Sequence, residues 1–118
     1  MRRMKLIGSK GEDLAAEFLK KKGYKIISRN YKTPIGEVDI IAEDKDTIVF
    51  VEVKTRSNNS FGYPFEAVGS RKQHKLKNLA LFYMKQRKKD LAVRFDVLSI
   101  HISEDKKEIE HIMDAFEV

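Results

Sequence analysis

The sequence contains no cysteine among its 118 residues. This absence excludes disulfide bonds, thiolate nucleophiles, iron–sulfur clusters and zinc sites built from cysteine. Any metal ion must therefore be bound by oxygen atoms or by imidazole. The three histidines, His74, His101 and His111, show no spacing typical of a metal site, and we assign none of them a catalytic role.

Long hydrophobic runs are also absent from the chain. No segment approaches the roughly 20 apolar residues that a membrane span requires, and the apolar stretch within residues 1–7 is too short for a signal peptide. We therefore expect a cytoplasmic protein with no membrane association. The length suits one domain, residues 1–118, and the 42% of hydrophobic residues are enough for a real core.

Basic residues outnumber acidic ones, with 24 Lys and Arg against 18 Asp and Glu and a formal net charge of +6. Lys and Arg release condensed counterions when they neutralise phosphates, so this balance favours a polyanionic partner, and nucleic acid more than an acidic small molecule. Solvated lysine-rich faces are common as well. The charge therefore indicates a partner and not a reaction.

The pattern of apolar and polar residues predicts the element order αβββαβ, followed by a tail. Ser9 and Glu12 have the spacing of a capping box, which predicts a helix from there to Gly23. A second helix, capped by Ser70, is predicted at 70–89. The predicted strands are 24–31, 37–43, 47–54 and 93–102, with a weaker strand or short helix at 108–116 and a long loop at 55–69.

The second and third predicted strands form an antiparallel hairpin. If residues 45–46 are the two loop residues, Asp39 lies opposite Glu52 and Glu37 lies opposite Lys54, and facing residues share one side of the sheet. A four-residue loop shifted by one position leaves the two acids diagonal and within reach, whereas a three-residue loop separates them unless a bulge intervenes. The other side would carry Val38, Ile40, Ala42, Val49, Val51 and Val53.

Neighbouring carboxylates in a sheet repel each other by roughly 0.2–1 kcal/mol, and a divalent cation would compensate. Mg²⁺ or Mn²⁺ suits Asp39 and Glu52, with the carbonyl of Val53 as a third ligand, because these ions prefer oxygen and keep several waters. Lys54 would adjoin such a water and could position it, deprotonate it or stabilise charge on phosphorus. The alternative is a solvated charged face in which Glu37 and Lys54 form an exposed ion pair.

Glu12 is a further candidate for this site. On a helical projection it falls within the apolar arc of the first helix, beside Ala16 and Leu19, so one acid of that helix points inward. Its spacing from Ser9 offers a second explanation, a residue that only caps the helix. Both roles could hold at once.

Candidate contacts to nucleic acid follow Lys54 in the chain. Basic side chains and backbone N–H groups at the start of the second helix could bind phosphates, and a plain solvated face is an equal alternative. The candidates are Thr55, Arg56, Arg71, Lys72, Lys75 and Lys77. Phe61, Tyr63 and Phe65 could stack on an unpaired base, but packing as a lid on the core is the favoured interpretation.

These residues resemble a known pattern. Asp39 matches the first acid of the PD-(D/E)xK nuclease superfamily and Glu52-Val53-Lys54 its second half, although Val38 replaces the proline of the nominal Pro-Asp pair. More closely, nearly the whole chain resembles the YraN family of small bacterial proteins. The matching motifs are Gly11-Glu12, Gly23-Tyr24, Arg29-Asn30-Tyr31, Gly36-Glu37-Val38-Asp39, Phe50-Val51-Glu52-Val53-Lys54-Thr55-Arg56 and Arg94-Phe95-Asp96-Val97.

The resemblance implies a restriction-endonuclease-like α/β fold, with a mixed sheet flanked by helices and a Mg²⁺-dependent phosphodiesterase site, similar to archaeal Holliday junction resolvases. It also implies that Glu12 corresponds to an extra acid on the first helix of those resolvases, which assists metal or water placement.

We therefore expect a Mg²⁺- or Mn²⁺-dependent endonuclease that hydrolyses DNA phosphodiester bonds, with branched or structured DNA as its substrate. The alternatives are a catalytically inactive nucleic-acid-binding module of a repair or recombination assembly, and a purely structural domain. Symmetric cleavage of a junction needs two copies of the site, so the function is compatible with a homodimer, on which the sequence is silent.

Overall fold

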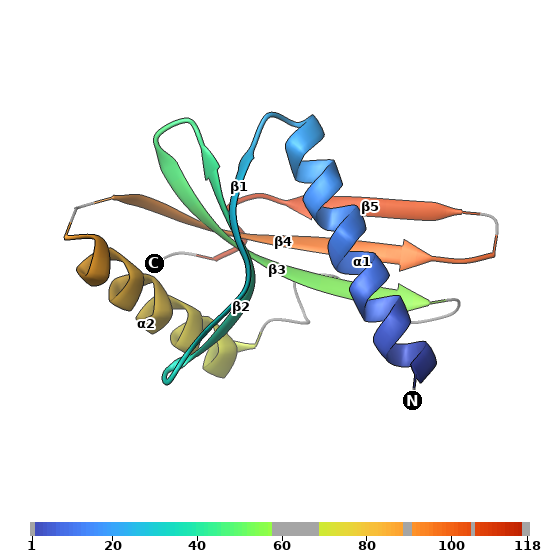
Figure 1. Cartoon of the computed structure of the whole chain (residues 1–118), viewed down its shortest axis with the longest axis horizontal. Helices are drawn as coiled ribbons and strands as arrows, with labels where there is room; N and C mark the ends of the chain where they lie inside the picture. The colour runs from blue at the N-terminus through green and yellow to red at the C-terminus, as the bar shows by residue number, and fades with distance from the viewer. Residues whose placement is uncertain (1, 58–68, 89–90, 105, 117–118) are drawn as a thin grey trace.

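The fold is seen in a computed structural model that describes residues 2–57, 69–88, 91–104 and 106–116. Within these residues five strands form one sheet in the order β1-β2-β3-β4-β5, and two helices lie against it (Figure 1). The elements are α1 (Arg2–Lys21), β1 (Lys25–Thr33), β2 (Gly36–Asp44), β3 (Thr47–Ser57), α2 (Ser70–Arg87), β4 (Ala92–Ile102) and β5 (Lys107–Ile112). The predicted mixed α/β fold and the order αβββαβ are confirmed, and the ambiguous last segment is an edge strand.

The sheet is mixed because the connection between β3 and β4 differs from the others. β1, β2 and β3 are successively antiparallel, β3 and β4 are parallel, and β5 returns antiparallel to β4. A parallel pair requires a crossover, and α2 lies in that connection. The parallel pairing continues to Ser57 opposite Ile102, so β3 extends past its predicted end at Lys54 into the predicted loop.

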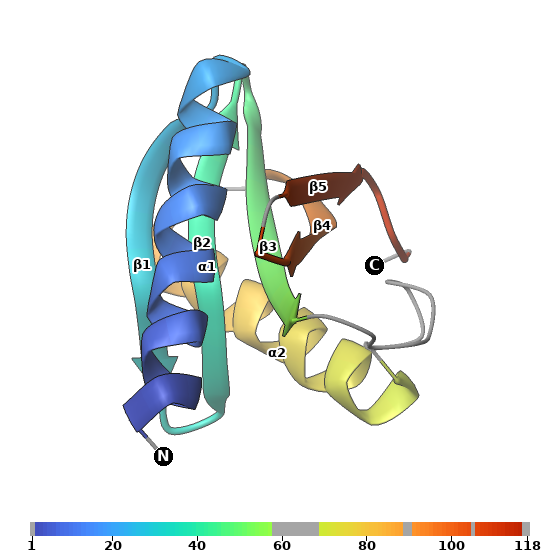
Figure 2. The same ribbon diagram turned by 90° about the vertical axis from the view of Figure 1, so that its right-hand side faces the viewer.

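The two helices cover opposite faces of the sheet (Figure 2). Consecutive strand residues point to opposite faces, and Ile40 and Ile41 of β2 accordingly belong to different clusters of buried residues. The α1 side contains Ala15, Ala16, Leu19, Ile40, Ala42, Val49, Val51, Leu98 and Ile100. The α2 side contains Ile41, Phe50, Leu76, Leu79, Ala80, Tyr83, Phe95 and Val97. The central strands are therefore buried on both faces.

The apolar side of the β2–β3 hairpin differs from the prediction at Val38. Ile40 and Val51 lie on the α1 side as expected, but Val38 packs in the cluster with α2. The described pairs between β2 and β3 end at Ile40 opposite Val51, while β2 remains paired with β1 as far as Gly36. Because β2 leaves β3 after Ile40, the alternation expected for a two-stranded ribbon does not extend to Val38. The two strands diverge at Asp39.

The predicted start of the first helix is wrong, and so are both predicted helix caps, whereas α2 does begin at Ser70. α1 begins at Arg2, so Ser9 lies inside the helix and cannot form a capping box with Glu12. The N-cap of α2 is Gly69, whose backbone is extended and which offers no side-chain cap, and Ser70 is the first helical residue. Lys88, with a left-handed φ of 55°, ends α2. Glu12 therefore has no capping role to explain its position.

Two predictions concern the loop aromatics and the absence of a membrane span. Phe61, Tyr63 and Phe65 lie outside the described residues, so their packing stays a prediction. Among the described residues, no helix combines the length and the apolar character that crossing a membrane would need.

Candidate active site

The hairpin register brings Asp39 and Glu52 together. The ladder from Asp44 opposite Thr47 to Ile40 opposite Val51 is the register predicted for a two-residue loop. Continued by one position, it would pair Asp39 with Glu52. Instead the strands diverge there, and Oδ2 of Asp39 accepts a hydrogen bond of 2.7 Å from the backbone N–H of Val53. The Asp39 side chain thus accepts a backbone N–H of β3 at the point where the pairing between β2 and β3 ends.

The acidic pair is poorly solvated and mutually repulsive. Glu52 is only 4% exposed, and Asp39 is partly buried. Burial, followed by the charge of Glu52, raises the pKa of Asp39 from 3.8 to about 7, against the opposing effect of the Val53 N–H. A side-chain hydrogen bond with Glu52 and the charge of Glu12 raise it further. With its pKa near 7, Asp39 keeps its proton to a much higher pH than an exposed aspartate would.

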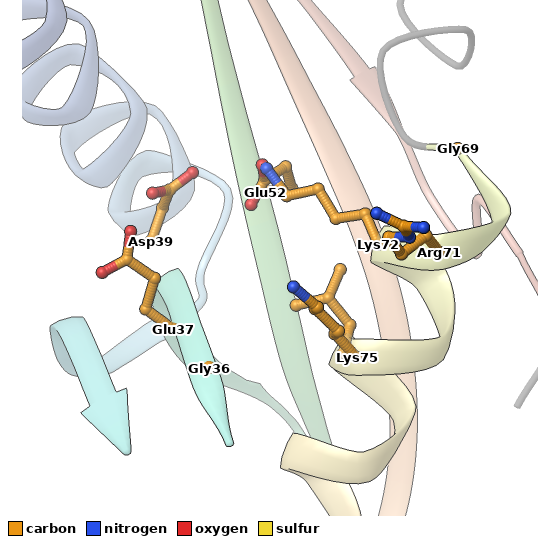
Figure 3. Close-up of a pocket in the computed structure, with 9 residues that line it drawn as sticks. Gly36, Glu37, Asp39, Glu52, Gly69, Arg71, Lys72 and Lys75 are labelled. Atoms are coloured by element: carbon orange, nitrogen blue, oxygen red, sulfur yellow. The ribbon is translucent and has the colours of Figure 1, made fainter. Parts of the chain in front are cut away.

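Two lysines contact the same oxygen of Glu52. Nζ of Lys54 lies 3.5 Å from Oε2, and Lys72 of α2 forms an ion pair with that oxygen from the other side of the site (Figure 3). Burial alone would lower the pKa of Lys72, but hydrogen bonding to Glu52 and its negative charge raise it. Both lysines are therefore in contact with a predicted metal ligand.

A cavity of about 460 Å³ opens at this point between the hairpin and the start of α2 (Figure 3). One wall carries the acids Glu37, Asp39 and Glu52, and the other carries the bases Arg71, Lys72 and Lys75. Gly36, Gly69 and Leu76 complete the described lining. A cation would be attracted to the first wall and a phosphate group to the second.

Glu12 approaches this site from the α1 side. Gly11 is buried where α1 crosses β3, and a Cβ added there would overlap the side chain of Thr55. This close approach brings Glu12, which is partly buried, near enough for its charge to raise the pKa of Asp39. The acid predicted to point inward is therefore electrostatically coupled to the acidic pair.

The structure separates the predicted phosphate contacts into two groups. Arg71, Lys72 and Lys75 line the cavity, as do Asp39 and Glu52. The described lining does not include Thr55, Arg56 or Lys77: Thr55 packs against Gly11, Arg56 lies further along β3, and Lys77 lies further along α2. Nor does it include Lys54, which reaches the site through its contact with Glu52.

The donor set suits an ion that retains water. Among the described residues, no three side chains of Asp, Glu, His or Cys gather into a metal-binding group, so the carboxylates of Asp39 and Glu52 stand as a pair. The N–H and C=O of one strand residue point toward the same neighbouring strand, so the carbonyl of Val53, like its N–H, faces Asp39. Two carboxylates and one carbonyl would offer oxygen ligands to Mg²⁺, an ion that commonly keeps several of its waters.

A second polar cluster, not predicted from the sequence, lies away from this cavity. The buried carboxylate of Asp96 accepts hydrogen bonds from Arg94 Nε (2.9 Å) and the backbone N–H of Asp114 (3.0 Å), and Nε2 of His111 lies 2.7 Å from it. Burial would raise the pKa of Asp96, but the bonds to His111, Arg94 and Asp114 lower it. The Arg94-Phe95-Asp96-Val97 motif was the only signal in the sequence. With its partners satisfied, this cluster joins β4 to β5 and stabilises the fold.

Similar proteins cover nearly the whole chain. The family described as Uncharacterised protein family UPF0102 matches residues 11–100. A UPF0102 protein of Thermodesulfovibrio yellowstonii is 52% identical over 110 residues, which cover 93% of this chain and 95% of that protein. One of Geobacter metallireducens is 50% identical over 115 residues, covering 97% of this chain and 94% of that protein.

One solved structure, that of Pyrococcus furiosus SfsA in complex with Ca²⁺, is a distant match. Its TM-score is 0.36 at 14% identity, and the match covers 98% of this chain but 65% of the SfsA chain. The likeness to the UPF0102 proteins is of a different order in both identity and coverage. On that evidence, the chain belongs to the UPF0102 family, the YraN family of the sequence resemblance.

Proposed function

We propose that this protein is a Mg²⁺- or Mn²⁺-dependent endonuclease that hydrolyses DNA phosphodiester bonds, with branched or structured DNA as the substrate. The observation that carries the proposal is the cavity with one acidic and one basic wall, at which Asp39 and Glu52 meet where β2 and β3 diverge. The order Asp39, Glu52, Lys54 across a hairpin supports it through the resemblance to the PD-(D/E)xK nucleases.

In this proposal Asp39, Glu52 and the Val53 carbonyl would hold the metal. The ion would supply neutralisation of phosphate charge and a more acidic water. Lys54, held 3.5 Å from Glu52, orients or deprotonates the attacking water or stabilises charge on the phosphate. Arg71 and Lys75 bind the phosphate backbone from the opposite wall, and Glu12 assists in placing the water or the metal.

The experiment is metal-dependent cleavage of linear, nicked and four-way DNA by the parent and by Asp39→Asn, Glu52→Gln and Lys54→Met. Asp46→Asn, in the exposed hairpin turn, is the matched control. We expect cleavage by the parent and the control, with losses of at least about 100-fold in the three site variants. Equal cleavage by all five proteins would show that a contaminating nuclease is responsible and would refute the assignment.

The second candidate is an inactive nucleic-acid-binding module of a repair or recombination assembly. The observation that favours it is that Lys54 and Lys72 both form ion pairs with Glu52 and so neutralise an acid that a metal would need. It predicts binding to DNA that weakens steeply with salt, without cleavage in any metal. In either case we propose a cytoplasmic protein, and a homodimer if both strands of a junction are cut.

A further inference from the structure

Lys72 belongs to the basic wall of the cavity, yet its ammonium group lies on the acidic wall. It is the third residue of α2, and its side chain spans the cavity to Glu52, whereas Lys75 points into the cavity from the next turn (Figure 3). Among the described residues, the ion pairs of Glu52 are with Lys54 and Lys72, both at Oε2. A divalent cation on Glu52 would meet these two positive charges.

The two lysines differ in how freely their ammonium groups can move away from Glu52. Lys54 lies two positions after Glu52 on β3, and β3 is paired with β4 both before and after Lys54. The side chain of Lys54 is 27% exposed. The side chain of Lys72 is 42% exposed and comes from a helix on the opposite wall. Rotation about its side-chain bonds moves the ammonium of Lys72 away from Glu52 without any change in the sheet.

We propose that Lys72 is a positioning residue that competes with the divalent metal for Glu52. Without metal its ammonium neutralises the acidic pair. When metal takes its place, the ammonium turns back toward Arg71 and Lys75, where a phosphate group would meet three positive charges instead of two. Metal and DNA phosphate would then be recruited together. The inference rests on the proposed function, because it concerns the same metal site.

The test measures Mn²⁺ binding by calorimetry without DNA, for the parent and for Lys72→Met, Lys72→Gln, Lys72→Arg and Lys75→Met. Both uncharged variants of Lys72 remove the competitor at a half-exposed helical position that tolerates substitution. We expect them to lower the Mn²⁺ Kd by roughly fivefold to tenfold, on the scale of a partly exposed ion pair. Lys72→Arg keeps the charge and a Kd within about twofold of the parent. Lys75→Met, which removes a charge from the same wall, also stays within about twofold.

A thermal scan in EDTA supplies the reciprocal measurement. Loss of the competitor leaves the acidic pair without its counter-charge, so Lys72→Met should melt below the parent in EDTA and approach it when Mn²⁺ is added. Lys75→Met should show no such convergence.

Three outcomes decide the matter. An unchanged or higher Mn²⁺ Kd in both uncharged Lys72 variants refutes the proposed competition. An equal decrease of the Kd in Lys75→Met also refutes it, because the effect would then come from the overall positive charge of the basic wall. In both cases a parent that binds Mn²⁺ and cleaves DNA leaves the proposed function intact. A parent that binds no Mn²⁺ overturns the proposed function itself, and the competition with it.

Discussion

Replacing Asp39 with asparagine tests the electrostatics of the acidic pair. Burial and the charge of Glu52 raise the pKa of Asp39 from 3.8 to about 7 in the folded protein. The folded state therefore holds a proton that the unfolded chain releases. The stability from this proton is fully present below about pH 4 and is lost as the pH rises through 7. The parent should lose stability over this range, and Asp39→Asn, which cannot ionise, should not.

The magnitude follows from the pKa difference. From 3.8 to about 7 is about 3 pH units, and at 1.36 kcal/mol each this gives an upper limit of about 4 kcal/mol. Part of the shift comes from the charge of Glu52, so its size depends on that neighbour as well as on the burial of Asp39. Asparagine keeps an oxygen that can accept the Val53 N–H, which preserves the 2.7 Å bond. We expect Asp39→Asn to exceed the parent in unfolding free energy by about 1–3 kcal/mol at pH 8 and by almost nothing at pH 4.

The assay is urea unfolding between pH 4 and pH 8 in EDTA, with Asp46→Asn in the exposed hairpin turn as the control. The control should follow the parent at every pH. Addition of Mn²⁺ at pH 8 should stabilise the parent and not Asp39→Asn, because the substitution removes a ligand. Parallel pH profiles for the parent and Asp39→Asn would refute the account of the acidic pair.

Two further predictions concern the stability of the fold. Gly11→Ala normally favours a helix by up to about 1 kcal/mol, but here the new Cβ overlaps Thr55, so we expect a net loss of about 1–2 kcal/mol in urea unfolding. Adding Thr55→Ala should recover part of that loss, and additive losses would contradict the overlap. Asp96→Asn removes the buried carboxylate that Arg94 and His111 contact and leaves Arg94, among the described residues, only its ion pair with Asp44, so we expect a loss of about 3 kcal/mol at pH 7. Because the pKa of Asp96 is lowered in the folded protein, its contribution to stability is present above pH 4 and is lost as the pH falls through the lowered pKa. A stability difference between the parent and Asp96→Asn that stayed constant from pH 7 to pH 2 would contradict this.

The hairpin shows how far pattern alone extends. Two turn residues and a period of two determine the register, and the pairs from Asp44 opposite Thr47 to Ile40 opposite Val51 follow it as predicted. The same rule failed at Val38, because it assumes two strands that stay paired, and β2 leaves β3 after Ile40. The capping box failed for a related reason: Ser9 and Glu12 have the right spacing, but local spacing does not exclude a helix that already began at Arg2.

The sequence by itself determined the order of the elements and the hairpin register that brings Asp39 and Glu52 to one site, because helix and strand periods act over a few neighbouring residues. Only the tertiary structure decided which distant groups join that pair. The ion pair of Lys72 with Glu52 and the approach of Glu12 at the Gly11–Thr55 contact depend on how two helices dock on opposite faces of the sheet. Such docking is fixed by packing among residues far apart in the chain, which no local period encodes.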